Sequence, residues 1–198
     1  MNHLDFIEIG TSNFDTIISG VKLEKGISIE PISYYLNSLP IKPNVLKMHC
    51  GISDKEELRT FYYIPEKIIQ EKKLPLWLKG CNSIDKIHPT AITECKNRNL
   101  DIEKIIESET VNTFTLQKIL TIFNIQVIDF LKIDTEGHDC IVLSTILDDL
   151  INKKILIKKI KFETNILSSR EEQKMILDKL STCYEIVTEG SNTILNKK

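Results

Sequence analysis

The sequence lacks the features that mark several classes of protein. It has no run of about 18 apolar residues, so no membrane-spanning helix is predicted. Its net charge of -2 at pH 7 gives no electrostatic reason to expect nucleic acid or an anionic membrane as a partner. The first residues, Met1 to Asp5, have neither the charge pattern nor the apolar segment of a signal peptide. We therefore expect an intracellular, cytoplasmic protein without a membrane span.

Paired cysteines are also missing. The five cysteines are far apart and include no Cys-x-x-Cys pair. An odd, scattered set is typical of reduced thiols rather than of a disulfide framework or a zinc site. The cysteines are Cys50, Cys81, Cys95, Cys140 and Cys183.

The remaining composition is that of an ordinary globular chain. The 198 residues are 41% hydrophobic and 27% charged, which suits one domain with one sizeable core. We expect a single domain over residues 1–198. The sequence indicates no oligomeric state.

Short strands alternate with helices along most of the chain, which predicts a parallel sheet with crossover helices. The expected strands are 6–10, 26–30, 44–50, 129–134 and 155–163, followed by a terminal hairpin of 185–188 and 193–195. The expected helices are 14–20, 32–39, 113–124, 137–151 and 168–180.

Residues 53–110 do not follow this alternation. The segment is too long for a simple connection, so we expect a lid or a substrate-binding insertion. Tyr62, Tyr63 and Trp77 are candidate apolar platforms for an acceptor. The alternative is a surface insertion without a role in binding.

The stretch from Asp129 to Asp139 is the centre of the chemistry. A short apolar strand ends in acids, a hydroxyl residue and a glycine, then enters a helix. Ligands of open α/β sheets bind beyond the carboxyl ends of strands. Lys132, inside the strand, needs a carboxylate partner, and we expect Glu163 or Glu136. The alternative is that the acids only serve the helix, with Asp134 or Thr135 as its cap.

A cofactor half-site is indicated by Glu8, Gly10 and Glu30. Glu30 ends the second strand 20 positions after Gly10, the distance at which an acid holds a nucleoside ribose. A pyrophosphate cofactor would require more glycines in this turn, so S-adenosylmethionine fits better than NAD. Glu8 is then expected to face the cofactor's ammonium group. The alternative is that Glu30 only precedes Pro31 at the start of a helix.

The residues also resemble a known family, the FkbM-type methyltransferases. Leu131–Asp139, followed by Val142-Leu143, is similar to its fourth-strand signature, L-K-I-D-x-E-G with an acid and V-L. Further similar segments are Phe6–Thr11, Ser28–Pro31, Cys50–Asp54, Gly80–Ser83 and Phe162–Asn165. The usual second glycine of the first motif is absent, and Phe14 lies near its place.

This resemblance implies a Rossmann-like class I methyltransferase fold of the α/β class. Such a fold has a mostly parallel seven-stranded sheet, a C-terminal antiparallel hairpin and helices on both faces. The implied activity is transfer of methyl from S-adenosylmethionine to an oxygen of a sugar, glycan or other small molecule.

The resemblance also implies a set of site residues. Asp134 is the first candidate for orienting or deprotonating the hydroxyl, His138 is the second, and Lys132 completes the catalytic set. The implied cofactor-binding residues are Glu8, Gly10, Thr11, Ser12, Asn13, Glu30, Pro31, Gly51, Ile52, Ser83 and Asp134.

Three oxygen-bearing side chains at neighbouring strand ends raise the question of a metal. Asp134, Glu163 and Asn165 correspond to positions that hold magnesium in some related O-methyltransferases, so Mg²⁺ or Mn²⁺ is considered. The alternative is that Glu163 neutralises Lys132 and Asn165 caps the next segment.

Two further alternatives remain open at this point. A nicotinamide-dependent oxidoreductase is disfavoured by the missing glycines. A catalytically silent scaffold is disfavoured by the acids at both strand ends.

Overall fold

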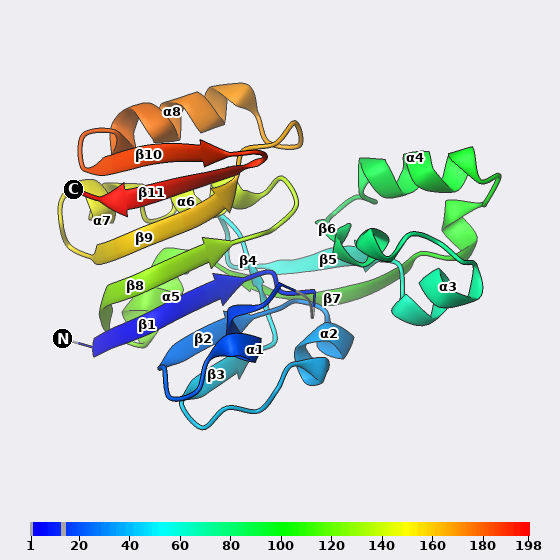
Figure 1. Cartoon of the computed structure of the whole chain (residues 1–198), viewed down its shortest axis with the longest axis horizontal. Coiled ribbons are helices and arrows are strands. Elements are labelled where there is room, and N and C mark those ends of the chain that lie inside the picture. Colours follow the sequence, from blue (N-terminus) through cyan, green and yellow to red (C-terminus); the bar gives the residue numbers. More distant parts are fainter. Residues whose placement is uncertain (1, 13–14) are drawn as a thin grey trace.

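The computed structural model describes residues 2–12 and 15–198. Its main sheet has seven strands in the order β10-β11-β9-β8-β1-β2-β3 (Figure 1). The strands are β1 (Asn2–Ile9), β2 (Gly26–Ile29), β3 (Val45–Met48), β8 (Ile125–Ile133), β9 (Leu156–Glu163), β10 (Tyr184–Glu189) and β11 (Asn192–Lys197). The first five are parallel, whereas β10 and β11 form an antiparallel hairpin that joins β9. The predicted α/β class, seven-stranded sheet and terminal hairpin are confirmed.

The centre of the sheet is the β1–β8 pair. Ile7 lies beside Leu131 and Ile9 beside Ile133, and all four side chains are buried. β-branched and leucine side chains of this kind favour strands whose two faces are both covered. Several parallel strands therefore end at one edge of the sheet, where their last residues meet.

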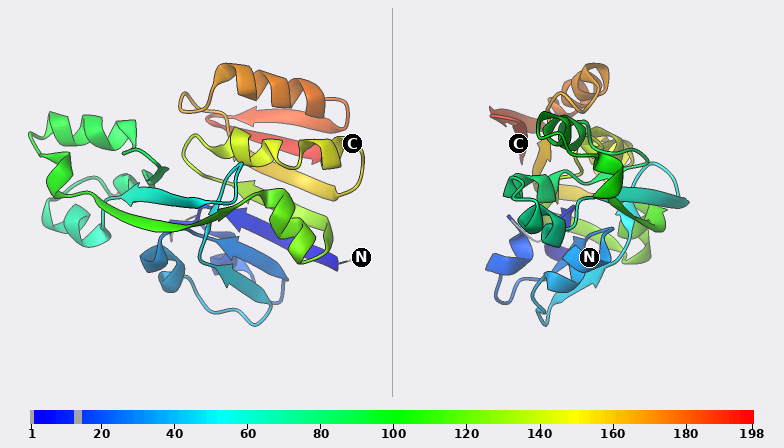
Figure 2. Two further views of the ribbon diagram at one scale, coloured as in Figure 1. Left: turned by 180° about the vertical axis from the view of Figure 1, so that it is seen from behind. Right: turned by 90° about the vertical axis from the view of Figure 1, so that its right-hand side faces the viewer.

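Helices cover both faces of the sheet, as predicted. One core cluster joins the sheet to α5 (Leu116–Ile122), α6 (Asp139–Ser144), α7 (Leu147–Ile151) and α8 (Arg170–Leu180). On the opposite face, Phe6 packs with Ile18 of α1 (Ile17–Gly20) and Leu36 of α2 (Ser33–Ser38). In the view of Figure 1, α5, α6, α7 and α8 lie behind the sheet and α1 lies in front of it. Figure 2 shows the same arrangement from behind.

All five predicted helices differ from the structure, α2 and α8 by no more than two residues at either end. Thr113 and Phe114 end a strand, and α5 begins at Leu116 after Thr115, whose hydroxyl accepts from the Lys118 amide. The helix expected over 137–151 is divided into α6 and α7. The helix expected over 14–20 begins only at Ile17, because Thr16 has an extended backbone, and Phe14 lies outside the described residues.

The segment between β3 and α5 contains a second sheet that the sequence did not predict. Its strand order is β4-β7-β5-β6. These strands are β4 (Gly51–Ile52), β5 (Leu58–Tyr63), β6 (Ser83–Ile84) and β7 (Glu107–Phe114). Its helical turns are α3 (Glu66–Glu71), η1 (Leu76–Gly80), α4 (Pro89–Asn97) and η2 (Ile102–Lys104). We call residues 53–110 the insertion.

The insertion has its own hydrophobic cluster, which includes Ile64, Leu78 and Cys95. It extends from the edge of the main sheet at which β1 and β8 end (Figures 1 and 2). This position places it above the carboxyl ends of the parallel strands.

All five cysteines are free thiols, as predicted. Within the residues that the structure describes, no helix is both long enough and apolar enough to cross a membrane.

Candidate active site

A cavity lies between the carboxyl ends of the parallel strands and the insertion. The empty space inside it is about 510 Å³, including the part that opens to solvent. Eight of the eleven predicted cofactor-binding residues line it: Gly10, Ser12, Glu30, Pro31, Gly51, Ile52, Ser83 and Asp134. His138 also lines it, whereas Asn13 lies outside the described residues.

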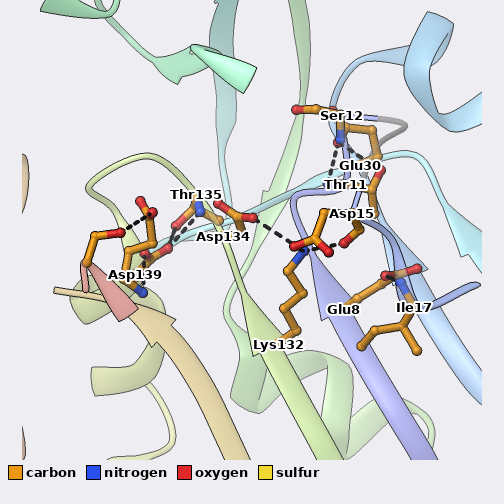
Figure 3. Close-up of polar contacts among 12 residues, drawn as sticks. Glu8, Thr11, Ser12, Asp15, Ile17, Glu30, Lys132, Asp134, Thr135 and Asp139 are labelled. Carbon is orange, nitrogen blue, oxygen red and sulfur yellow. Dashed lines mark hydrogen bonds and ion pairs between the residues drawn. The ribbon is translucent and has the colours of Figure 1, made fainter. Parts of the chain in front are cut away.

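Glu30 holds the turn that follows β1. Its Oε2 accepts hydrogen bonds from the Thr11 amide (2.8 Å), the Thr11 hydroxyl (3.1 Å) and the Ser12 amide (3.0 Å) (Figure 3). Its Oε1 accepts one from the Ile32 amide at 3.0 Å. Burial raises the pKa of Glu30, and these donors oppose that shift. Thr11 thus reaches the site through Glu30 rather than by lining the cavity.

Glu8 contacts the start of α1. Its carboxylate accepts from the Ile17 amide (2.6 Å), the Ile18 amide (3.2 Å) and the Ser28 hydroxyl (2.5 Å). These contacts fix the start of α1, and Glu8 does not line the cavity. The carboxylate is thus used by the start of α1 and by Ser28, and its contact with a cofactor's ammonium group stays a prediction.

Lys132 joins the first turn to the end of β8. Its buried ammonium donates to the Asp15 carbonyl (2.6 Å) and lies 3.3 Å from the Asp15 carboxylate and 3.4 Å from that of Asp134 (Figure 3). The expected partners, Glu163 and Glu136, are not the ones used. Lys132 does not line the cavity, so it acts on the site through Asp134 and Asp15.

Gly10 allows β1 and β8 to end side by side. Its φ of +76° is in the left-handed region, and a Cβ there would lie 1.9 Å from the Asp134 carbonyl oxygen. A residue with a side chain at this position would push the turn after β1 away from Asp134.

The turn after β8 is held by Asp139. This buried carboxylate accepts from the Thr135 amide (2.7 Å), the Thr135 hydroxyl and the Glu163 amide (3.1 Å) (Figure 3). Burial and nearby Asp134 raise the pKa of Asp139 to about 7 despite these donors. Asp139 therefore fastens the end of β8 to the end of β9. The predicted helix cap by Asp134 or Thr135 is wrong, because α6 has no side-chain cap.

Glu136 and His88 form a pair that the sequence did not reveal. Glu136, which lines the cavity, has a φ of +52°, and its carboxylate lies 3.2 Å from Nε2 of His88. His88 is buried, and its Nδ1 accepts from the Thr90 amide at the start of α4. With Nδ1 as the acceptor, Nε2 is the nitrogen that donates to Glu136, which links the insertion to the turn after β8.

His138 is suited to accept a proton near neutral pH. Its Nε2 lies 3.0 Å from the Ser53 hydroxyl. Burial, with a contribution from Arg59, lowers the pKa of His138 below its ordinary value of 6.5. The ring is therefore neutral at pH 7, as a general base requires.

The three residues proposed as metal ligands make other contacts. Asn165 donates from Nδ2 to Glu163 (2.7 Å), and its Oδ1 accepts from the Leu167 amide (2.9 Å). Burial, with Asp134, Glu136 and Asp139 nearby, raises the pKa of Glu163 to about 7. These contacts match the alternative in which Asn165 is structural, although Glu163 does not pair with Lys132. Over residues 2–12 and 15–198, the one cluster of three His, Cys, Asp or Glu ligand atoms within 4.8 Å is His3, Asp5 and Asp129.

The insertion contributes Phe61, Gly80, Asn82, Ser83 and Ile84 to the cavity. Ser83 donates its hydroxyl to the Lys86 carbonyl at 2.6 Å, so it supports the wall of the cavity. None of the three aromatic residues expected as platforms lines the cavity. Tyr63 packs on Tyr35, and Trp77 is 47% exposed on η1. The aromatic residue that lines the cavity is Phe61.

The sequence reasoning missed several of these residues for identifiable reasons. Asn82 lies in the same short segment as Ser83, so the signal was available. Phe61 and His88 lie in a region without periodicity. In the folded chain, Phe61 lines the cavity and His88 contacts Glu136, which lines it.

One of three comparisons with known proteins gives a match. A family model described as the methyltransferase FkbM domain matches residues 9–183. Neither the curated proteins nor the solved structures contain a significant match.

Proposed function

Because the chain belongs to the FkbM methyltransferase family, and is an S-adenosylmethionine-dependent methyltransferase, we propose that it methylates a hydroxyl oxygen of a sugar, glycan or other small molecule. The observation that carries the proposal is that Glu30, at the end of β2, and Asp134, at the end of β8, line one cavity. The family membership also overturns the alternative interpretation of the chain as a nicotinamide-dependent oxidoreductase.

The residues of the cavity fit the cofactor. Glu30 lies at the end of β2, where an acid holds a nucleoside ribose, and the turn around Gly10 lies beside it in the same cavity. When bound, S-adenosylmethionine supplies a sulfonium methyl group that a hydroxyl oxygen takes by in-line displacement while losing its proton.

The surrounding acids favour an acceptor without negative charge. Asp134 and Glu136 line the cavity, and both lie close enough to Glu163 to raise its pKa. Carboxylates accept hydrogen bonds from sugar hydroxyls but repel phosphates and other carboxylates. Neutral sugars and polyols are therefore the proposed acceptors.

The proposed roles follow from the contacts. Asp134, held by Lys132, orients the acceptor hydroxyl, and His138, neutral at pH 7, receives its proton. A correctly placed base contributes typically about 10²- to 10⁴-fold in rate. We propose that no metal takes part, since Oδ1 of Asn165 is used by Leu167.

The proposal is tested by incubating the protein with methyl-labelled S-adenosylmethionine and fractionated glycans and small molecules. We expect label in a neutral hydroxyl compound, stable to mild alkali as a methyl ether is and a methyl ester is not. Turnover should be unchanged in excess EDTA. Transfer to nitrogen or to a carboxylate would contradict the proposal. Cofactor binding without transfer to any fraction would favour the silent scaffold.

A further inference from the structure

Asn82 connects the insertion to the turn after β1. Its Nδ2 donates to the Ser12 hydroxyl at 2.8 Å, although the two residues are 70 positions apart. Both residues line the cavity. The contact therefore closes part of the cavity between the insertion and the main sheet.

The side-chain oxygen of Asn82 lacks a donor. Oδ1 is buried and has no hydrogen-bond partner among the residues that the structure describes. A buried acceptor left unpaired is costly, and native proteins rarely keep one without a functional reason. A donor supplied by a ligand in the cavity would satisfy it.

The contacts of Glu30 indicate which group of the ligand could donate to Oδ1 of Asn82. Its carboxylate already accepts four hydrogen bonds, three of them at Oε2. Each carboxylate oxygen offers about two acceptor positions, so one position remains, at Oε1. A ribose brings two hydroxyl donors, so Glu30 alone cannot serve both while it holds Thr11 and Ser12.

Ser12 lies between the two acceptors. Its amide donates to Glu30 (Figure 3), its hydroxyl accepts from Asn82, and its φ is +43°. A serine in this left-handed region requires contacts that hold it there. Glu30, Ser12 and Asn82 thus form one network along the wall of the cavity.

We propose that Asn82 is a cofactor-binding residue: its Oδ1 accepts a hydrogen bond from a ribose hydroxyl, while its Nδ2 keeps the insertion closed on Ser12. The proposal rests on S-adenosylmethionine as the cofactor but not on the identity of the acceptor. Ribose recognition is then shared between the main sheet and the insertion.

The test compares affinities for S-adenosylhomocysteine and for its analogues that lack the 2′- or the 3′-hydroxyl. Asn82→Ala should weaken binding of the parent compound about five- to tenfold. It should weaken binding of one of the two analogues much less, because that analogue lacks the donor. The matched control is Asn97→Ala, an exposed asparagine at the end of α4, which should bind all three compounds as the wild type does.

Equal losses for all three compounds, or no loss, would overturn the ribose contact. Failure of the wild-type protein to bind S-adenosylhomocysteine would overturn the cofactor assignment and the proposal with it. Ser12→Gly guards against misfolding, since glycine adopts a φ of +43° without strain and keeps the amide that bonds Glu30. It should speed the release of S-adenosylhomocysteine, and a wild-type release rate would overturn the closure.

Discussion

At the residue scale, side chains at and beside the cavity also hold the backbone around it in place. Glu30 fixes the turn through Thr11 and Ser12 and also lines the cavity. Lys132 fixes Asp15 and Asp134 without reaching the cavity. Substitutions at such positions therefore affect binding both directly and through the shape of the turn.

Glu30→Gln should weaken the binding of S-adenosylmethionine and S-adenosylhomocysteine about ten- to a hundredfold. The substitution removes the charge and turns one acceptor into a donor that faces backbone amides, and a charge-assisted hydrogen bond contributes about 1.5–3 kcal/mol. Calorimetry measures the change. The control is Glu185→Gln on the exposed edge of β10. Unchanged affinity in a folded Glu30→Gln protein would remove Glu30 from the site.

His138 should set the acidic limb of the pH–rate profile. A general base works only when deprotonated, and burial lowers the pKa of His138 below 6.5. As the pH is lowered, turnover should therefore stay constant down to about 6.5 and fall at a lower pH. His138→Gln should lower turnover about 10²- to 10⁴-fold and abolish this limb. His3→Gln, at the other end of the sheet, should leave the profile unchanged. An identical limb in His138→Gln would assign the base to another group.

At the scale of elements, the site depends on the contacts that hold the ends of neighbouring strands together. Asp139 accepts hydrogen bonds from the amides of Thr135 and Glu163 and so holds the ends of β8 and β9 together beside the cavity. Gly10 keeps β1 equally close to β8. These contacts lie at the surface of the main core, yet their groups are mostly buried.

Asp139→Ala should lower the free energy of unfolding by about 2–3 kcal/mol. The substitution leaves two backbone amides and the Thr135 hydroxyl without their acceptor. Urea denaturation measures the loss, and Asp148→Ala, at an exposed position of α7, should change it by less than about 0.5 kcal/mol. If Asp139→Ala lowers the free energy of unfolding no more than the control does, the hydrogen bonds of Asp139 do not stabilise the fold.

The same residue gives stability a pH dependence. The pKa of Asp139 is about 7 in the folded protein, against an ordinary value of 3.8. The folded state thus holds more protons between these values, and its stability should fall as the pH rises from about 4 to about 7. Asp139→Ala should flatten this part of the pH–stability curve.

The element pattern could be predicted because it follows from local periodicity. Alternating strands and helices around Ile7–Gly10 and Leu131–Asp134 gave the parallel sheet, and the acids at their ends gave the location of the site. The partners of Lys132 and Glu8 could not be obtained in this way. Each has several acids or amides within reach along the sequence, and only the packed turn decides which one it meets.

At the scale of the whole molecule, the insertion is more organised than its sequence indicated. Its two long strands, β5 and β7, lack a regular alternation of apolar and polar residues, so the sequence does not identify them as a pair. Its internal cluster and its contribution of Phe61 and Asn82 to the cavity become visible only in three dimensions.

Hydrogen exchange should show the insertion closing on the cofactor. With S-adenosylhomocysteine bound, exchange should slow in residues 10–12 and 80–84, which both contribute to the cavity. Residues 92–99, on the outer part of α4, serve as an internal control and should not change. Protection confined to residues 8–32 would make the insertion a passive one.

The separate hydrophobic cluster of the insertion has a consequence for evolution and engineering. Because residues such as Ile69, Leu78 and Cys95 pack against one another, substitutions among them leave the packing around Ile7 and Leu131 intact. The sequence of the insertion can therefore change separately from that of the main sheet, or be replaced by the insertion of a relative. Because Phe61 and Asn82 line the cavity, the cofactor site proposed above requires counterparts of both residues in any insertion that replaces this one.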